Sequence, residues 1–337
     1  MGPQWSNNSR VDVNRTPVSI AVGVLSLFFQ ASGAGPIQKI LWHPVDQTLV
    51  WHDHRQIRHQ ASPKDAASTR VAETSMMRIR DLAFDSTGER LAIAGGQPGE
   101  WGEIEILQWP SGERLFYAQR DDDWFTVVAF NPQNDGLVTG GADARISIWK
   151  PHIGQTMLHR EHTWQAHSDS IMEIVWDASG SWLLSAGADH AIKCWEAQTW
   201  ALQRGFNEHT GMVHALALRP GRKDGSSKNP PMEMASASAD QSIRIWQPIR
   251  GRMVRIVRPS KNRFLCVSYH PSGRWLAAAG EGGEIHLLDA DSDQEIHTLQ
   301  TDQAPVFTLS FSPNGKWLAA GDDSGRVQSY PFSGEWP

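Results

Sequence analysis

Short runs of alternating apolar and polar residues fill most of this chain, and turn residues separate one run from the next. Residues 183–195, Leu-Leu-Ser-Ala-Gly-Ala-Asp-His-Ala-Ile-Lys-Cys-Trp, predict a strand, a tight turn and a second strand. The apolar residues 171–176 precede them and lead into Asp-Ala-Ser-Gly, which is typical of a turn. No segment sustains the period of a long helix. The pattern therefore predicts an all-β fold.

The strand–turn–strand phrase recurs along the chain. Its further copies, two close and two weaker, are residues 137–149, 234–246, 276–288 and 318–330. In the three close versions the turn residues Asp143, Asp189 and Asp240 lie 46 and 51 residues apart, and each precedes a Trp by six residues. A period of about 40–45 residues with four short strands per unit is the sequence signature of a β-propeller blade. One blade cannot bury both of its faces alone, so the repeats predict a single closed ring.

These repeats resemble those of the WD-repeat (WD40) β-propeller family, and in particular its bacterial type. The resemblance covers roughly residues 36–330, is specific in the three central copies and is loose at both ends. It implies an all-β, seven-bladed β-propeller of four-stranded antiparallel blades within residues 35–337. The expected blades are, approximately, residues 36–74, 77–119, 123–161, 165–207, 209–258, 262–299 and 304–330. The last of them shows only three clear strands.

An insertion separates the second and third strands of the second blade. Residues 95–102 read Gly-Gly-Gln-Pro-Gly-Glu-Trp-Gly, and they resemble a segment of bacterial WD-repeat proteins. In several of those relatives the propeller is attached to a c-type cytochrome module. The resemblance therefore raises the hypothesis of an accessory subunit in an extracytoplasmic complex. A longer insertion in the fifth blade, residues 221–231, is rich in Gly, Ser and Pro and predicts a loop.

Two of the repeats contain the same four polar residues. In WD repeats, a His before the first strand, a Ser on the second, the turn Asp and the Trp of the third form a buried hydrogen-bonded tetrad. The resemblance implies two such sets, His167, Ser185, Asp189, Trp195 and His209, Ser236, Asp240, Trp246. Ser, His and Asp also occur in nucleophilic catalysis, but an active site is usually single and two copies favour a scaffold. The third blade has Thr139, Asp143 and Trp149 without a matching His, which predicts an incomplete network.

Composition narrows the classes of function. The chain has 337 residues with 16 Trp, and packing between blades has a natural use for such large flat side chains. The formal charge of −6 argues against a nucleic-acid binder. The two cysteines, Cys194 and Cys266, fall on blades two places apart, too far for a disulfide, and are expected to be free buried thiols.

Two clusters contain residue types that ligate metals in other proteins. His52 and His54, with His59 nearby, offer imidazoles, but zinc needs a third and fourth ligand that the spacing does not supply. The acidic residues 121–123 offer oxygen ligands without the Gly-punctuated loop of a calcium site. Solvated turns explain both clusters more simply. The sequence therefore predicts no catalytic, cofactor-binding or metal-binding residue.

Two features are candidates for contact with a protein partner. One is a basic run without an acid among its charges: Arg250, Arg252, Arg255, Arg258, Lys261 and Arg263. The run is explained either by protection of an exposed outer strand or by a patch that faces an anionic surface. The other is Trp101, an aromatic residue between glycines in the insertion of the second blade. It serves either as a partner contact, since aromatic residues dominate binding hot spots, or to pack its own loop.

The N-terminal residues allow three interpretations. Residues 18–29 are mostly apolar, Arg10 and Arg15 precede them, and small residues 31–34 follow, which is the pattern of a secretory signal peptide. The apolar stretch is too short for a membrane-spanning helix. Alternation at residues 18–24 also fits a strand that closes the last blade, and a disordered tail is the third option. The signal places the protein in the periplasm or outside the cell; the alternative is the cytoplasm.

The fold and the absence of a catalytic set favour a non-catalytic scaffold that mediates protein–protein interaction. The alternative is a propeller enzyme or small-ligand binder that uses the central channel, which requires carboxylates or histidines that converge at the channel mouth. A fold alone does not determine function.

Overall fold

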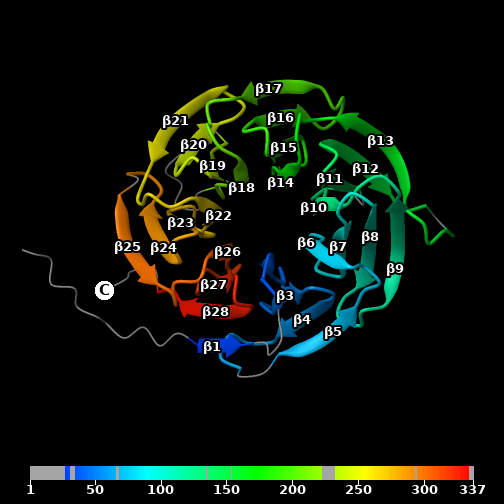
Figure 1. Ribbon diagram of the computed structural model, residues 1–337, viewed down its shortest axis with the longest axis horizontal. Coiled ribbons are helices and arrows are strands. Elements are labelled where there is room, and N and C mark those ends of the chain that lie inside the picture. The colour runs from blue at the N-terminus through cyan, green and yellow to red at the C-terminus, as the bar shows by residue number, and fades with distance from the viewer. Residues whose placement is uncertain are drawn as a thin grey trace, which may run out of the picture.

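The computed structural model describes residues 35–65, 68–133, 136–152, 154–221, 232–292 and 294–333, together with the backbone of residues 27–30. These residues form seven four-stranded antiparallel sheets and no helix. Figure 1 shows the sheets side by side in a closed ring. The seven-bladed β-propeller predicted from the sequence is therefore confirmed.

In blades one to six, the strands run in chain order from the channel to the rim (Figure 1). Blade one comprises β2 (Ile40–Trp42), β3 (Leu49–Asp53), β4 (Gln56–Gln60) and β5 (Thr69–Glu73). Blade two comprises β6 (Arg78–Phe84), β7 (Arg90–Gln97), β8 (Trp101–Gln108) and β9 (Arg114–Arg120). Blade three comprises β10 (Phe125–Phe130), β11 (Leu137–Gly141), β12 (Arg145–Lys150) and β13 (His159–Gln165).

The remaining blades repeat this arrangement. Blade four comprises β14 (Ile171–Trp176), β15 (Trp182–Gly187), β16 (Ile192–Glu196) and β17 (Leu202–Phe206). Blade five comprises β18 (Val213–Leu218), β19 (Met234–Ser238), β20 (Ile243–Gln247) and β21 (Arg252–Val257). Blade six comprises β22 (Phe264–Tyr269), β23 (Trp275–Gly280), β24 (Glu284–Asp289) and β25 (Glu295–Gln300). Blade seven takes β26 (Val306–Phe311), β27 (Trp317–Asp322) and β28 (Arg326–Pro331) from the end of the chain.

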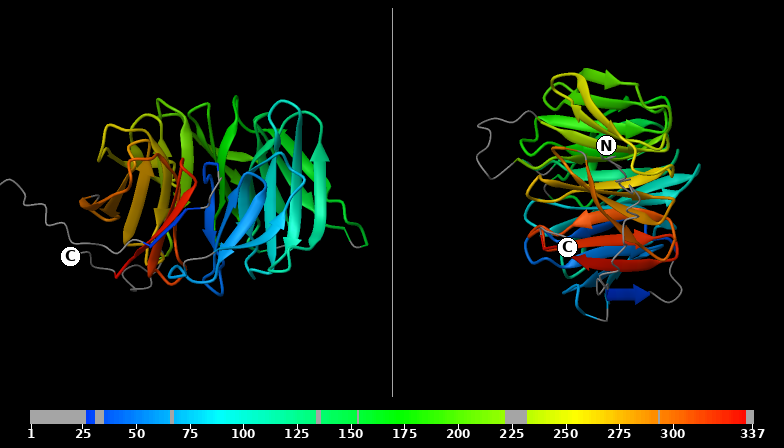
Figure 2. Two further views of the ribbon diagram at one scale, coloured as in Figure 1. Left: turned by 60° about the horizontal axis from the view of Figure 1, so that its bottom comes forward. Right: turned by 90° about the vertical axis from the view of Figure 1, so that its left-hand side faces the viewer.

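The fourth strand of blade seven comes from the other end of the chain. Strand β1 (Leu27–Gln30) pairs antiparallel with β28, so that Leu27 lies opposite Ser329 and Gln30 opposite Arg326. Figure 2 shows this strand beside the red strands of blade seven. Residues 1–26 and 31–34 lie outside the described residues. They include the alternating stretch and the parts of the signal-peptide pattern on either side of β1. Residues 222–231 of the fifth-blade insertion also lie outside the described residues.

The core lies between adjacent blades. Alternate residues of each strand face the neighbouring sheet, so apolar side chains from two blades meet in one layer. Between blades three and four, Ile146 and Ile148 pack with Leu183 and Trp195, and Trp164 covers the cluster. Six further clusters of this kind are found in the described chain, which explains the use of many large side chains. Cys194 and Cys266 are buried and unpaired.

Candidate functional site

Four polar residues of blade four form a continuous chain of hydrogen bonds. His167 precedes β14, Ser185 lies on β15, Asp189 lies in the turn after β15, and Trp195 lies on β16. The Trp195 Nε1 donates to Ser185 Oγ at 3.0 Å, and Ser185 Oγ lies 2.7 Å from His167 Nε2. The other ring nitrogen, Nδ1, lies 2.9 Å from Asp189 Oδ1. Burial acts to raise the pKa of Asp189, but the bonds from His167 and the Ser168 N–H outweigh it and lower that pKa.

Blade five brings together an equivalent set. His209 Nδ1 lies 2.7 Å from Asp240 Oδ2, and His209 Nε2 lies 2.7 Å from Ser236 Oγ, which accepts from Trp246 Nε1 at 2.8 Å. Burial lowers the pKa of His209 to about 4, so the ring is neutral at pH 7. Burial acts to raise the pKa of Asp240, but hydrogen bonds from Ser242 and His209 lower it to about 2. A neutral imidazole can accept from Ser236 at one nitrogen and donate to Asp240 at the other.

The surroundings of the two serines decide between a structural and a catalytic role. Ser185 and Ser236 are 0% exposed, and each hydroxyl oxygen already accepts from an indole N–H. A serine nucleophile must reach a substrate carbonyl, and neither oxygen can do so from the interior of a blade. The two sets therefore hold the strands and turns of their blades together.

Blade three uses an arginine where blades four and five use a histidine. Arg120, the last residue of β9, donates from Nη1 to Asp143 Oδ2 at 2.7 Å. Its other donors bond the carbonyls of Asp123 at 2.6 Å and Trp124 at 2.7 Å. Thr139 Oγ1 accepts from Trp149 Nε1 at 2.8 Å, so the second half of the network is also present. Among the described residues, no hydrogen bond joins Arg120 to Thr139, so the two halves remain separate and the preceding blade supplies only the bond to Asp143.

The insertion of blade two extends two strands and does not form a separate loop. Strands β7 and β8 continue their pairing until Gln97 lies opposite Trp101. Gly96 adopts φ +136°, and a Cβ there would lie 2.2 Å from the Trp101 carbonyl oxygen. The hairpin is fixed to the linker before blade three, because the Gly99 N–H donates to Asp123 Oδ1 at 2.9 Å. The glycines thus permit a tight hairpin that carries Trp101 at its end.

Trp101 lines a pocket at this hairpin. The pocket has a volume of about 510 Å³ and is lined by Ser75, Glu100, Trp101, Glu103, Gln119, Arg120 and Asp121. Glu103 is 1% exposed, and its two carboxylate oxygens lie 3.3 and 3.2 Å from the Ser75 hydroxyl. One hydroxyl proton cannot satisfy both oxygens. The pocket therefore combines a partly buried indole with a buried carboxylate that has acceptor capacity to spare.

The basic run is divided among several contacts. Arg252, at the start of the outer strand β21, donates from Nε to Gln247 Oε1 at 2.9 Å. Arg255 donates to the carbonyls of Ala290 at 2.9 Å and Asp291 at 3.3 Å, and so joins blade five to blade six. These two side chains are engaged within the protein, and they line the rim of the ring.

The other members of the run lie on the surface. Arg263 forms an exposed ion pair with Glu281 at 3.5 Å. Within the part of the chain that the structure describes, the exposed members without an ion pair are Arg250, Arg258 and Lys261. The run passes from the rim to the linker between blades five and six, so its six charges do not form one patch. Charges on an outer strand discourage pairing with other chains.

The histidines and aspartates of the two clusters lie in different surroundings. His52 lies on β3 and is 1% exposed, contrary to the expectation of a solvated turn. His59 packs edge-on against Trp109, with ring centroids 5.6 Å apart. Asp123 accepts the Gly99 N–H and its neighbour's N–H, which explains the acidic junction as a turn. Within the described residues, no group of three or more His, Cys, Asp or Glu side chains could hold a metal ion.

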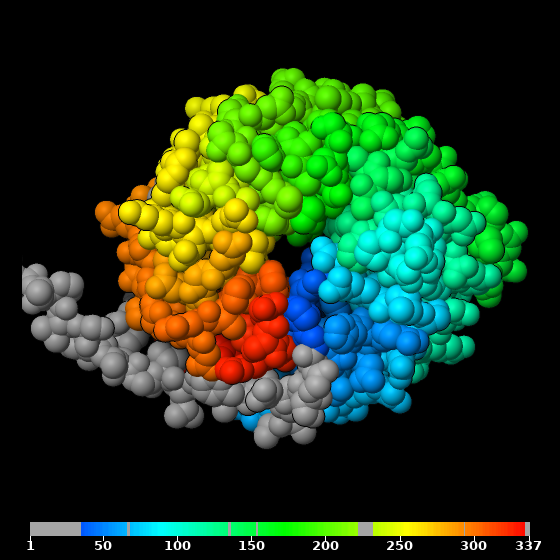
Figure 3. Space-filling view, viewed as in Figure 1, coloured from blue at the N-terminus to red at the C-terminus, as the bar shows by residue number. Residues whose placement is uncertain are grey.

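The central channel is lined by one equivalent residue from each of six blades. The first strand of each of these blades has a register shift near its start, and one residue is left unpaired there. Such a bulge turns its side chain out of the usual alternation. These residues are Arg80, Thr126, Met172, His214, Leu265 and Phe307, and all of them line a cavity of about 590 Å³. We call this set the bulge ring. Figure 3 shows the hollow at the centre of the ring of blades.

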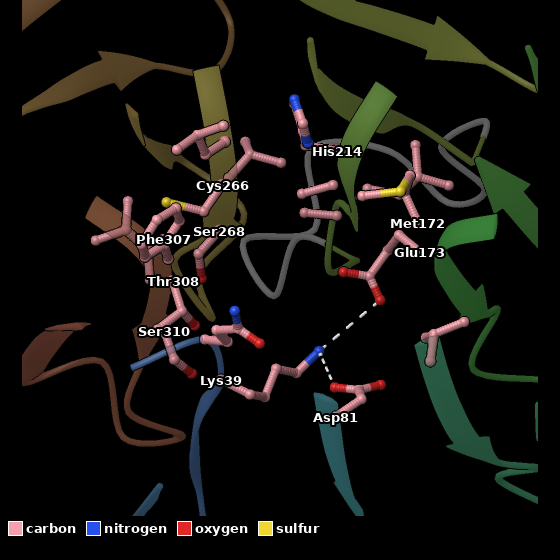
Figure 4. A pocket seen from close by; sticks show the side chains of 18 of the residues that line it. Lys39, Asp81, Met172, Glu173, His214, Cys266, Ser268, Phe307, Thr308 and Ser310 are labelled. Carbon is pink, nitrogen blue, oxygen red and sulfur yellow. Dashed lines mark ion pairs between the residues drawn. The ribbon is translucent and has the colours of Figure 1, made fainter. Parts of the chain in front are cut away.

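Below the bulge ring, an ion cluster crosses the channel (Figure 4). Lys39 Nζ lies 2.9 Å from Asp81 Oδ1 and 3.8 Å from Glu173 Oε1. Asp81 also accepts the Val128 N–H at 2.8 Å. Burial lowers the pKa of Lys39, but the charges of Asp81 and Glu173 outweigh it and raise that pKa above its ordinary value. Burial raises the pKa of Glu173 to about 7, against the opposing charge of Lys39. Blades one, two and four are thus tied together across the channel.

Comparison with family models decides the nature of the repeats. The model for "WD domain, G-beta repeat" matches residues 114–150, 159–196, 200–247 and 293–330. The model for "Anaphase-promoting complex subunit 4 WD40 domain" matches residues 229–311. The chain contains WD40 repeats.

Relatives of the WD40 propeller are distant and longer. The chain is 25% identical over 212 residues to the Periodic tryptophan protein 2 homolog of Dictyostelium discoideum, and the match covers 62% of this chain and 22% of that protein. It is 24% identical over 220 residues to the Nuclear distribution protein PAC1 of Arthroderma otae, covering 64% of this chain and 45% of that protein. The chain thus spans less than half the length of these relatives. Both are eukaryotic, so the bacterial type expected from the sequence receives no support here.

Solved structures share the architecture. The WD40 propeller superposes on the β-propeller domain of Doa1 with a TM-score of 0.73 at 16% identity, covering 93% of this chain and 98% of that one. It superposes on a chain of the Mitotic Checkpoint Complex with a TM-score of 0.78 at 15% identity, covering 98% and 99%. At such identities the likeness shows the fold alone. Among the described residues, no helix is long and apolar enough to cross a membrane.

Sequence reasoning missed three groups in this WD40 propeller. Arg120 was indicated only by its place before the acidic linker, and the ion cluster of Lys39, Asp81 and Glu173 joins residues from three repeats. The bulge ring interrupts the period-2 pattern by one residue, which alternation alone does not reveal. Comparing the same position in successive repeats would have found it.

Proposed function

We propose that this WD40 propeller is a non-catalytic scaffold that binds a protein partner at the Trp101 pocket. The supporting observation is the combination of Trp101 with Glu103, Glu100 and Asp121 around one cavity of about 510 Å³. An indole face and nearby carboxylates both attract a cationic group. A Lys or Arg side chain of the partner fits this chemistry. The spare acceptor capacity of the Glu103 carboxylate then receives the cation's N–H donors.

The burial of both Ser–His–Asp sets supports a role without catalysis, because neither serine can reach a substrate. One of the relatives is named a nuclear distribution protein, and such a name fits a protein that works inside the cell. We infer that the protein works in the cytoplasm and not in a periplasm, because the relatives come from eukaryotes, whose cells have no periplasm. The pairing of β1 with β28 supports this inference, since cleavage after residue 34 would remove a strand of blade seven.

Cross-linking capture of the tagged full chain from its native cells tests the proposal. We expect a defined partner with the unaltered chain and its loss with Trp101→Ala and with Glu103→Gln. Ile296→Ala is the matched control, because Ile296 is 45% exposed on the outer strand of blade six and should leave capture unchanged. Equal capture by Trp101→Ala and Ile296→Ala contradicts docking at this pocket. Unfolding of Trp101→Ala contradicts it as well, because the indole is then part of the core.

A further inference from the structure

The bulge ring places an arginine and a histidine on opposite walls of the channel. Arg80 belongs to blade two and His214 to blade five, which are three places apart in the ring of seven. The positions between them hold Met172, Leu265 and Phe307, which are apolar, and Thr126. Figure 4 shows His214, Met172 and Phe307 around the channel, with Lys39 at its other side.

Both side chains have unused hydrogen-bonding capacity. Arg80 donates from Nη1 to Gln38 Oε1 at 2.8 Å, but its Nε is buried and has no partner among the described residues. His214 is half-buried, and within the same part of the chain it forms no hydrogen bond. A buried donor without a partner is rare and costs free energy, so the Arg80 Nε points to a ligand that supplies the partner.

Arginines from two blades lie near the bulge ring. Arg78 and Arg263 are exposed near the start of their first strands, and Arg263 is paired with Glu281 at 3.5 Å. Burial and the charges of Arg263 and Arg80 lower the pKa of His214 to about 4, so its ring is neutral at pH 7 and can act as an N–H donor to an anion. The nearest acids of the channel wall, Asp81 and Glu173, already face Lys39 at 2.9 and 3.8 Å. The two carboxylates are therefore compensated, whereas the charge of Arg80 has no acidic partner within ion-pair distance among the described residues.

We propose that the channel binds an organic anion whose carboxylate or phosphate lies between Arg80 and His214. Its apolar part then contacts Met172, Leu265 and Phe307. The Arg80 guanidinium is held in place for this role, because it bonds Gln38 and lies 5.0 Å from the ring of Trp124. The cavity of about 590 Å³ is within the usual range for small-molecule sites. The site is separate from the Trp101 pocket and does not depend on the docking proposed there.

The same anionic group could belong to a free metabolite or to an acidic side chain that enters the channel. Isothermal titration calorimetry of the full chain at low ionic strength separates the two. The probes are phenyl phosphate for a free anion, the peptide acetyl-Phe-Glu-Phe-amide for an acidic side chain, and benzyl alcohol as the neutral analogue. We expect one of the two anions to bind with 1:1 stoichiometry and benzyl alcohol to bind at least tenfold more weakly.

Variants assign the site. Arg80→Gln should weaken the bound anion about tenfold or more, because a charge-assisted hydrogen bond is lost, and His214→Gln should weaken it to a smaller extent. Arg145→Gln removes the same charge from an exposed position on blade three and should bind like the unaltered chain. Circular dichroism confirms that each variant is folded, and His214→Gln carries the test if Arg80→Gln is not. Absence of binding by both anions at millimolar concentration, or equal affinity of Arg80→Gln and Arg145→Gln, overturns the proposal.

Discussion

Arg120 lies 2.7 Å from Asp143, at the position where the two following blades use a histidine. The carboxylate of the turn is satisfied in all three blades, but by a different donor in blade three. Arg120 also bonds two carbonyls of the linker and lies 4.2 Å from the ring of Phe125. The arginine therefore secures the junction between blades two and three as well as the turn.

Replacing Arg120 should destabilise the protein strongly. In Arg120→Ala, Asp143 loses its charged partner and two carbonyls lose a donor, which should cost about 3 kcal/mol. Urea denaturation measures this loss. Arg145→Ala is the control, since that side chain is exposed, and its midpoint should match the unaltered chain. Equal midpoints for the two variants would show that Arg120 has no structural role.

Asp189→Ala tests the hydrogen-bond chain of blade four. His167 loses its acceptor, and the turn loses the bonds that Asp189 accepts from Ser168 and Ala191. The free energy of unfolding should fall by about 1–3 kcal/mol. Glu208→Ala removes an exposed acid of the same charge and should have little effect. A melting temperature of Asp189→Ala equal to that of Glu208→Ala would count against the structural tetrad.

The free energy of unfolding should depend on pH through His209 and Asp240. The ordinary pKa of histidine is about 6.5, and that of His209 is lowered to about 4 in the fold, so the unfolded chain binds more protons between these values. The stabilising contribution of neutral His209 is complete above pH 6.5 and is lost as the pH falls towards 4. Asp240, lowered from 3.8 to about 2, adds a second loss below pH 3.8.

We would measure denaturation midpoints between pH 8 and pH 3 for the unaltered chain and for His209→Gln. The comparison separates the contribution of His209 from those of the other titrating groups. His209→Gln should be less stable at pH 8 and should show a shallower decline towards pH 4. His162→Gln, altered at an exposed histidine, should follow the unaltered chain. Parallel curves for His209→Gln and His162→Gln would refute the assignment.

Gly96→Ala should disturb the hairpin that carries Trp101. An alanine at φ +136° is strained, and its Cβ would lie 2.2 Å from the Trp101 carbonyl oxygen, so the cost should exceed about 1 kcal/mol. Gly205→Ala is the matched control, because a Cβ there meets nothing within 4 Å. Thermal unfolding of both variants tests whether Gly96 is required. Similar melting temperatures would show that the hairpin accommodates an alanine without loss of stability.

Two truncations test the closure of blade seven. A chain that lacks residues 1–34 loses β1, whereas one that lacks residues 1–26 keeps it. The shorter product should lose roughly 1 kcal/mol for each backbone hydrogen bond to β28 and should aggregate more readily, because an edge is exposed. The longer product should resemble the full chain. If the shorter product is equally stable and monomeric, the strand contributes nothing, and removal of a signal peptide is compatible with the fold.

The fold was predictable because its evidence is local and repeated. The turn residues Asp143, Asp189 and Asp240 recur at a blade's spacing, and each is followed by a Trp six residues later. Repetition of one pattern makes the number of blades evident even where single copies are weak. The four-residue sets of blades four and five follow the same spacing, and the structure brings their members together.

The candidate sites were less predictable because they depend on positions far apart in the sequence. Arg80 and His214 meet at one channel only because their strands carry equivalent bulges, and neither has a distinctive local motif. Trp101 was found as an aromatic between glycines, but its strand pairing with Gln97 and the buried Glu103 beside it require the register of β7 and β8. Long-range register is set by packing across blades, which one sequence does not display.

The pairing of β1 with β28 also orders events during synthesis. The ribosome releases residues 27–30 well before β28, so the ring cannot be sealed until the last of its seven blades has emerged. Inner blades can stack earlier on their neighbours, since their strands are consecutive. Between the emergence of β28 and its pairing with β1, the outer edge of β28 can accept a strand from another nascent molecule. The time that the early segment takes to find β28 therefore sets the period in which this propeller is open to misassembly.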